Sequence, residues 1–139
     1  MSIREYSDMV NRESFADILR TICVERGWEL LPSGVNVKHA DGRHQVIHFE
    51  LFDNREREGV RLTSMIGEAK GMSYEQMEQA LRANMNLAHG ALALHHDELC
   101  LTETLSLDEA EAGEIESAVE FIADLADMYE KILFGTDRH

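Results

Sequence analysis

The sequence predicts a single α+β domain in which amphipathic helices pack on an antiparallel sheet. Segments with the apolar spacing of helices alternate with segments rich in β-branched residues. The chain of 139 residues can bury about two-thirds of its extended surface without disulfides or metal ions, and 44% of its residues are hydrophobic. The expected order is helix, three-stranded antiparallel meander, helix, β-hairpin and a long C-terminal helix packed on the sheet. We expect residues 12–135 to form this domain, residues 1–11 to fray, and residues 136–139 to be a tail.

The first helix is predicted by apolar residues that recur every three or four positions from Phe15 to Cys23. Asn11 and Ser14 are the candidate N-cap residues that precede this pattern. Gly27 is expected to end the helix, because glycine readily adopts the left-handed conformation found after helix C-termini. The result is an amphipathic helix.

Three segments rich in β-branched and aromatic residues follow, at residues 35–38, 45–52 and 59–66. The first two are separated by Asp41-Gly42, and the last two by a charged run at residues 54–58. These short connections predict a three-stranded meander.

The register of the first two strands depends on the length of their loop. A two-residue turn at Asp41-Gly42 would pair Val37 with Val46 and place the apolar residues of the two strands on opposite faces. A three-residue loop at residues 41–43, with Gly42 at positive φ, keeps one apolar face, and we adopt it. It predicts the following pairs: Val37 with Ile47, and Val35 with Phe49.

The middle helix starts at a capping box, Ser73 to Gln76, flanked by Met72 and Met77 as a hydrophobic staple. Gly90 ends this helical segment. Its stripe consists of Tyr74, Met77, Leu81, Asn84, Met85 and Ala88. Asn84 is the one polar member, and we expect it to satisfy backbone groups at the helix end rather than to contact a ligand.

A β-hairpin is predicted at residues 91–94 and 99–102, around a turn at residues 95–98. Strand alternation places leucines on one face of this hairpin and small residues on the other. The leucine face has Leu92 and Leu94 opposite Leu101 and Leu99. The small face has Ala91, Ala93, Cys100 and Thr102.

The last helix is predicted at residues 108–134, with Ser106 or Asp108 as its N-cap, and Gly113 weakens its first turn. Its apolar face consists of Ile115, Ala118, Val119, Ile122, Leu125, Ala126, Tyr129, Ile132 and Leu133. Its acidic face consists of Glu116, Glu120, Asp124, Asp127 and Glu130. We expect the acidic face to be solvated rather than to hold a cation, because its carboxylates do not converge on one point. Contact with a basic partner stays open.

Composition and charge argue against several classes of function. The 13 basic and 27 acidic residues give a net charge of −14, which opposes binding to nucleic acids and anionic membranes. The longest apolar runs have four residues, far below the roughly 18 that span a bilayer, so we expect no membrane insertion. The N-terminus lacks the apolar core of a secretory signal. We expect a cytoplasmic protein with reduced thiols at Cys23 and Cys100.

Seven histidines suggest a metal site, but the predicted strands disperse them. His44 and His48 share a strand face at a separation of about 13 Å, too far for one ion. His95 and His96, with Asp97, would form only a weak site, and we expect solvated turn residues there. We therefore assign no catalytic, cofactor-binding or metal-binding residue. A small metal-dependent enzyme is the least favoured hypothesis.

Four short motifs occur in an order that is typical of one family. They are Leu62–Gly67 at the end of the third strand, Ala80–Asn84 in the middle helix, Gly90–Leu94 at the start of the hairpin, and Leu99-x-Leu101 followed by Leu105-x-Leu107. In these motifs and in its order of elements from Phe15 to Phe134, the chain resembles the type III secretion chaperones. These form the Tir chaperone or CesT-like superfamily, which includes the YbjN-like proteins.

This resemblance implies a non-enzymatic homodimer, without cofactors, that holds an extended segment of a client protein. The alternative is a YbjN-like regulatory protein without a secretion client. In the family, the middle helix and the following strand meet their own copies across a two-fold axis. The small residues of the hairpin here would allow such close approach. The expected dimer interface consists of Met77, Leu81, Met85, Ala91, Ala93 and Cys100.

Overall fold

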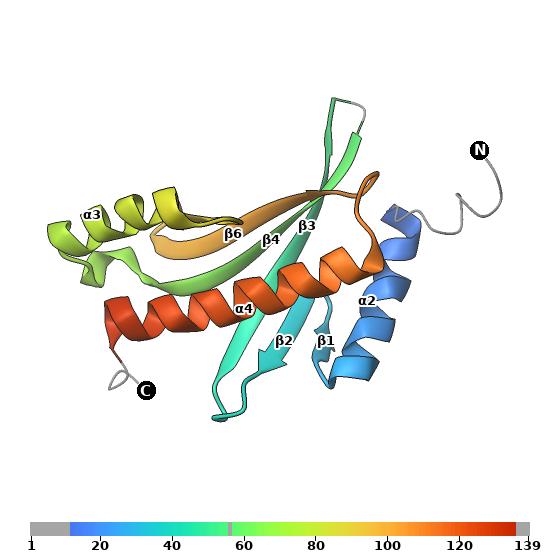
Figure 1. Cartoon of the computed structure of the whole chain (residues 1–139), viewed down its shortest axis with the longest axis horizontal. Helices are drawn as coiled ribbons and strands as arrows, with labels where there is room; N and C mark the ends of the chain where they lie inside the picture. Colours follow the sequence, from blue (N-terminus) through green and yellow to red (C-terminus); the bar gives the residue numbers. More distant parts are fainter. Residues whose placement is uncertain (1–11, 56, 136–139) are drawn as a thin grey trace.

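The computed structural model describes residues 12–55 and 57–135 as one six-stranded antiparallel sheet with helices (Figure 1). The elements are α2 (Arg12–Arg26), β1 (Glu29–Leu31), β2 (Gly34–Lys38), β3 (His44–Asn54), β4 (Arg57–Glu68), η1 (Ala69–Gly71), α3 (Tyr74–Ala83), η2 (Asn84–Asn86), β5 (Ala91–His95), β6 (Glu98–Ser106) and α4 (Ala112–Phe134). The strand order is β1-β2-β3-β4-β6-β5. The α+β class and the long helix packed on the sheet are confirmed. The proposed frayed segment 1–11 and tail 136–139 lie outside the described residues.

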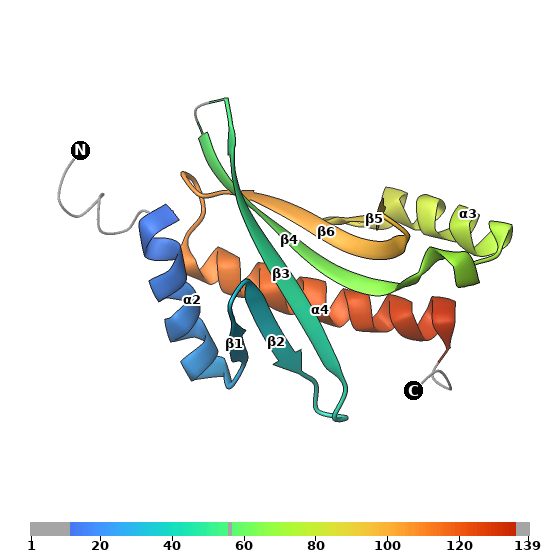
Figure 2. The same ribbon diagram turned by 180° about the vertical axis from the view of Figure 1, so that it is seen from behind.

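The helices of the described chain all lie on one side of the sheet. Helix α4 runs along this side, with α2 near the β1 edge and α3 near the end of α4 (Figure 1). Seen from behind, the long strands β3, β4 and β6 lie in front of α4 with no helix over them (Figure 2). The sheet therefore has one covered face and one open face.

The core lies between the covered face and α4. Strand alternation sends every second side chain toward the helix, so each strand contributes apolar residues to one face only. Burial of each large side chain contributes about 1.5–3 kcal/mol. The largest fully buried side chains include Val35, Ile47, Val60, Leu62, Leu101, Leu107, Ile115, Val119 and Ile122.

Helix α2 ends where the sequence predicted. Gly27 has φ +72°, and the Trp28 N–H donates to the Cys23 carbonyl at 3.0 Å. Ser14 lies inside the helix, so its prediction as an N-cap is wrong, and Asn11 lies outside the described residues. A short strand that the sequence did not predict, β1, follows directly and pairs with β2. Its three residues are too few to show an alternating pattern.

The predicted register of β2 and β3 is shifted by two residues. Val35 pairs with Ile47 and Val37 with Gln45, so the apolar residues still share one face. The loop has three residues, as predicted, but they are residues 40–42. Gly42 N–H donates to the His39 carbonyl, and Gly42 has φ +89°. The glycine thus adopts positive φ at the last position of the loop, whereas the prediction had placed it in the middle.

The predicted register of the β5–β6 hairpin is confirmed at every pair. Leu92 pairs with Leu101, Leu94 with Leu99, and Ala93 with Cys100. Leu94 lies on the leucine face, yet it is 57% exposed. It lies near the hairpin tip on the edge strand of the sheet.

The last helix starts later than predicted. Helix α4 begins at Ala112, and its N-cap residue Glu111 makes no side-chain capping bond, so Ser106 and Asp108 are not its caps. Ser106 ends β6, and its carbonyl accepts from Ala110 N–H at 2.9 Å. Ala110, in the connection between β6 and α4, is only 5% exposed, so apolar packing rather than a capping bond fixes where this helix starts.

The predicted apolar face of α4 is largely confirmed. Leu125 and Tyr129 are half-buried. Ile132 is 62% exposed, so the prediction is wrong there, because this residue lies at the margin of the apolar stripe. The buried residues of the predicted face are Ile115, Ala118, Val119, Ile122, Ala126 and Leu133. No helix within the described ranges is both long and apolar enough to cross a bilayer.

Candidate protein-binding site

Helix α3 and the following turn η2 expose apolar side chains. The predicted capping box is present: the Ser73 hydroxyl accepts from Gln76 N–H, and the Gln76 side chain accepts from Ser73 N–H. The same Gln76 side chain donates to the Leu133 carbonyl at 2.7 Å, which holds α3 against the end of α4. Within α3, only Ala80 is fully buried. Most of the predicted stripe is therefore left without a partner in the single chain.

The segment from α3 to β5 exposes four large apolar side chains, which together we call the α3–β5 patch. In order along the chain, its members are Tyr74 at 83%, Leu81 at 71%, Met85 at 87% and Leu94 at 57% relative exposure. Large apolar side chains rarely gather at such exposure on a monomer, and such surfaces mark interaction sites.

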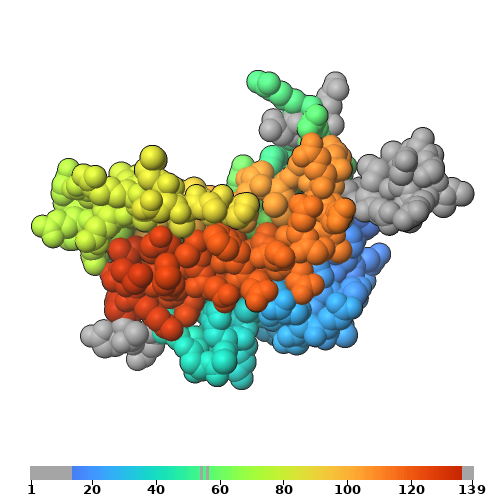
Figure 3. All heavy atoms as spheres, in the orientation of Figure 1, coloured from blue at the N-terminus to red at the C-terminus, as the bar shows by residue number. Residues whose placement is uncertain are grey.

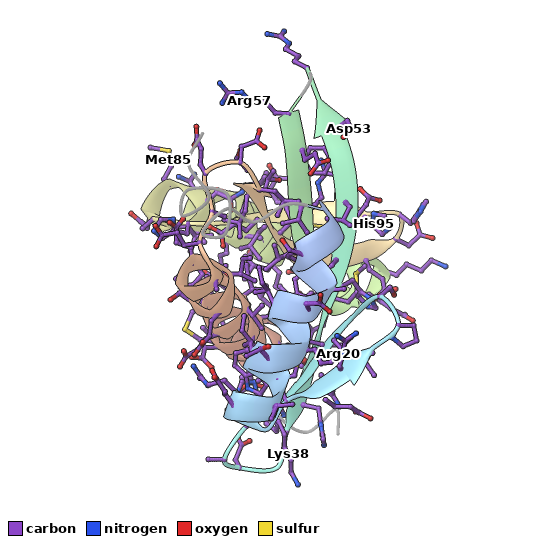
Figure 4. All side chains as sticks on the ribbon, turned by 90° about the vertical axis from the view of Figure 1, so that its right-hand side faces the viewer. Arg20, Lys38, Asp53, Arg57, Met85 and His95 are labelled. Atoms are coloured by element: carbon purple, nitrogen blue, oxygen red, sulfur yellow. The ribbon has the colours of Figure 1, made fainter. Side chains whose placement is uncertain are left out.

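The six predicted interface residues fall into two groups. Leu81 and Met85 belong to the α3–β5 patch, and Met77 is half-buried beside them on α3. The three hairpin residues, Ala91, Ala93 and Cys100, lie on the open face. In Figure 4, Met85 lies on the α4 side of the sheet, and His95, which shares a face of β5 with Ala91 and Ala93, lies on the other side.

The alanines and the cysteine of the hairpin differ in burial. Ala91 and Ala93 are half-buried on the open face, whereas Cys100 is only 3% exposed. Burial raises the pKa of the Cys100 thiol, and the nearby Glu98 carboxylate adds to this. Burial likewise raises the pKa of the Cys23 thiol on α2. A raised thiol pKa disfavours the reactive thiolate.

Asn84 satisfies backbone groups, as expected, but those of the edge strand rather than of its own helix. Its side-chain amide donates to the Leu92 carbonyl at 3.1 Å and accepts from the Leu92 N–H at 2.7 Å. Strand β5 is an edge of the sheet, where unpaired backbone groups can recruit another strand. Asn84 therefore closes this edge at one position, next to the exposed Leu94.

A cavity of about 530 Å³ lies beside the N-terminal half of α4. The segment from α3 to β5 lies next to α4 on this face (Figure 3). The ring of His89 meets Phe121 edge-on at 5.9 Å, and its Nδ1 lies 3.7 Å from the Glu103 carboxylate. The cavity is lined by His89, Glu103, Leu105, Glu111, Gly113, Glu114, Ser117, Ala118 and Phe121.

The sequence analysis missed this cavity, although one signal was present. Along β6, the inward positions are Leu99, Leu101, Glu103 and Leu105. An acidic residue at an inward position of an otherwise leucine-rich strand marks either a buried ion pair or a binding site. Only the fold shows which elements surround it.

The N-terminal part of the acidic face of α4 is paired with α2. Arg26 contacts Glu116 at 2.8 Å and Glu120 at 3.1 Å, and its guanidinium lies 4.6 Å from the centre of the Trp28 ring. The acidic face that the sequence predicted is therefore paired with an arginine at these positions, the contact with a basic group that the sequence left open. The basic partner comes from the same chain.

The C-terminal part of this face is paired with the β2–β3 loop. Arg43 contacts Asp127 at 2.6 Å and Glu130 at 3.1 Å, and Lys131 bridges Asp127 and Asp41. Asp127 is only 8% exposed. Burial raises the pKa of Asp127, but hydrogen bonds from Arg43 and Lys131 outweigh it, and the net pKa lies below its usual value. These carboxylates dock the loop on the helix.

The histidines do not form a ligand set in the part of the chain that the structure describes. His44 and His48 are both exposed on β3, and the rings of His95 and His96 are 4.5 Å apart in the hairpin turn. Residues 12–55 and 57–135 contain no group of three or more His, Cys, Asp or Glu side chains placed to hold a metal ion.

Comparison with known proteins gives similarity in structure but not in sequence. No protein-family model matches the chain, and the curated proteins contain no significant sequence match. The type III secretion chaperone SycH of Yersinia pestis, solved with a stable fragment of YscM2, aligns with a TM-score of 0.56 at 19% identity. That alignment covers 81% of this chain and 97% of SycH.

Two further solved structures are similar. A chain of the HopA1–SchA chaperone–effector complex has a TM-score of 0.59 at 9% identity and covers 84% of this chain and 93% of its own. YbjN from E. coli has a TM-score of 0.53 at 15% identity, and the alignment covers 86% of this chain and 88% of the YbjN chain. The chain therefore has the fold shared by type III secretion chaperones and YbjN, and the resemblance inferred from the sequence is confirmed at the level of the fold.

Proposed function

We propose that this chain is a non-enzymatic homodimer of the cytoplasm that holds an extended segment of a client protein. The observation that carries the proposal is the α3–β5 patch, four large apolar side chains that the single chain leaves exposed. The chain has the fold of two chaperones, one solved with a stable fragment of YscM2 and the other in a chaperone–effector complex. Two buried free cysteines, Cys23 and Cys100, fit a reducing compartment.

The dimer is proposed to form around β5 and α3. Burial of exposed apolar side chains against a second copy removes them from water, which is the main driving force for association. The half-buried alanines of the open face leave room for close approach. The proposed interface keeps all six residues: Met77, Leu81, Met85, Ala91, Ala93 and Cys100.

Light scattering after size-exclusion chromatography tests the dimer. A mass near twice the 15.8 kDa of one chain is expected at micromolar concentration. Leu81→Glu and Ala93→Glu should each give monomers, because the two-fold axis buries every introduced charge twice. Val24→Glu is the matched control, since Val24 is 79% exposed on α2. A wild-type mass of one chain would refute the dimer.

Client binding is tested by affinity capture from the native cell. One co-purifying protein, retained through a segment that binds as an isolated synthetic peptide, would support the chaperone function. The similarity to YbjN supports a second candidate, a regulatory protein without a secretion client. A partner that binds only as a folded domain would favour that candidate over the chaperone.

A further inference from the structure

The cavity beside α4 combines apolar walls with a charged floor. Leu105 of β6 and Ala118 and Phe121 of α4 supply the apolar walls. Its volume, about 530 Å³, lies within the range of roughly 300–1,000 Å³ that is typical of ligand sites. Such a cavity fits a group with an aliphatic stem and a polar head.

Glu103 forms the floor of the cavity. Its carboxylate has little positive charge nearby to offset its burial. It pairs across the sheet with the fully buried Leu62, and its side chain is only 12% exposed. Burial raises the pKa of Glu103, an effect that His89 offsets only in part. Among the described residues, His89 supplies the one basic group within 4 Å of this carboxylate, at 3.7 Å on a largely exposed ring. A cation paired with this carboxylate would offset part of the solvation energy lost on burial.

The rim of the cavity favours cations as well. Glu111 and Glu114, at the start of α4, are exposed and add negative charge at the opening. Clefts lined by charge of one sign concentrate ligands of the opposite sign. Among the described residues, no three His, Cys, Asp or Glu side chains are placed to hold a metal ion, so the carboxylates of the cavity do not converge on one point. An organic cation therefore fits the cavity better than a metal ion does.

The apolar surface continues beyond the cavity along α4. Met128 and Ile132 follow Phe121 by seven and eleven residues, so they lie on the same side of the helix. Met128 is 41% exposed and Ile132 is 62% exposed. A surface of this length exceeds what a small amine would cover, and it fits a polypeptide.

We infer that the cavity receives a lysine or arginine side chain of the bound partner, whose charged head pairs with Glu103. The aliphatic stem packs on Leu105 and Phe121, and the neighbouring partner residues run along α4. This inference rests on the proposed function in that the partner is a polypeptide. Beyond that function, it states which kind of partner residue the cavity recognises and by which contacts.

A titration tests the cavity itself. The 15N-labelled protein is titrated with n-butylguanidinium and with its neutral analogue n-butylurea, and binding is followed by NMR. The wild-type protein should bind the cation about tenfold more tightly, because a charge-assisted hydrogen bond replaces a neutral one. The amides of Glu103 and Phe121 should shift. Equal affinity for the two probes, or shifts confined to other surfaces, would overturn the inference.

Three variants sharpen this test. Glu103→Gln keeps the shape of the side chain and should abolish the preference for the cation. Ser117→Trp, at an exposed position of the lining, should block both probes without altering the core. Asp124→Asn removes one charge from an exposed part of α4 and should leave the preference unchanged. A loss of preference in Asp124→Asn would show that net charge, not the cavity, selects the cation.

Selection of short random peptides separates failure of the inference from failure of the proposed function. Peptides selected by the wild-type protein should be enriched in lysine or arginine at one position, and those selected by Glu103→Gln should not. Selected peptides with equal composition would overturn the inference alone. If neither protein selects peptides, the client-binding function fails, and the two-probe titration still decides whether the cavity binds a basic side chain.

Discussion

At the scale of single residues, Asp127 belongs to a helix face that the sequence predicts to be exposed, yet its side chain is buried in an ion pair. It lies on the acidic face of α4, yet it is 8% exposed and accepts from the Arg43 guanidinium at 2.6 Å. Loss of one partner of a buried ion pair costs more than the intact pair contributes, because the remaining charge stays desolvated. Arg43 is therefore expected to matter more than its surface loop position suggests.

Arg43→Met should destabilise the fold by about 1–3 kcal/mol, the cost of a buried carboxylate that loses a hydrogen-bond partner. Urea unfolding at neutral pH measures this loss. Arg20→Met is the control, because Arg20 pairs with Asp17 on the exposed side of α2. That exposed pair should contribute under about 1 kcal/mol. Equal effects of the two substitutions would contradict the role of Asp127 as a buried anion.

Asp127 also predicts a loss of stability in acid. Its folded pKa lies below the unfolded value of about 3.9, so the folded state binds its proton less readily. The stabilisation is fully present above pH 4 to 5 and is lost as pH falls through the folded pKa. Urea unfolding from pH 6 to about pH 3 should show a shallower decline in Asp127→Asn than in the wild type. Parallel curves would contradict the prediction.

At the scale of elements, Asn84 links the end of α3 to the edge strand β5. The two hydrogen bonds to Leu92 occupy both backbone groups that point away from β6 at this position. An amide side chain can do this because it carries a donor and an acceptor side by side, as a peptide group does. The middle helix is thus fastened to the sheet edge by one residue.

Asn84→Ala should cost about 1–2 kcal/mol, since two hydrogen bonds are lost and water replaces them only in part. The Leu92 amide should exchange with deuterium faster than in the wild type, and this readout is specific to the edge. Asn86→Ala, in the exposed part of η2, is the control. An unchanged exchange rate at Leu92 would show that Asn84 does not protect the edge.

At the scale of the whole molecule, charge is unevenly distributed. From Asp97 onward the sequence has 13 acidic and 2 basic residues, a net charge of −11 out of −14. Arg26 and Arg43, from the first third of the chain, neutralise part of this excess on α4. Repulsion among the many carboxylates therefore destabilises the fold, and the close ion pairs of Arg26 and Arg43 stabilise it.

Added salt should stabilise the fold modestly, because the net charge of −14 leaves repulsion in excess of pairing. Between about 0.05 and 0.5 M NaCl, we expect the melting temperature to rise by about 2–4 °C. The rise should be larger in Arg43→Met, where Asp127 and Glu130 lose their neutralising partner. A melting temperature independent of salt would contradict this balance.

Local features were predictable because neighbours in sequence produce them. The capping box at Ser73, the end of α2 at Gly27 and every pair of the β5–β6 hairpin follow from residue types at short spacing. The register of β2 and β3 failed by two residues, because hydrophobic alternation specifies the face but not the position along the strand. The position of Gly42 in the turn determines the register of these two strands.

By itself, the sequence determined the class of the fold, the faces of its strands and the excess of negative charge, because these depend on composition and on periods of two or about 3.6 residues. Only the tertiary structure decided which faces stay open. It placed Arg43 against Asp127, left Leu81 and Met85 exposed, and enclosed Glu103 in a cavity. These contacts join residues far apart along the chain, and their geometry depends on how the helices cross the sheet.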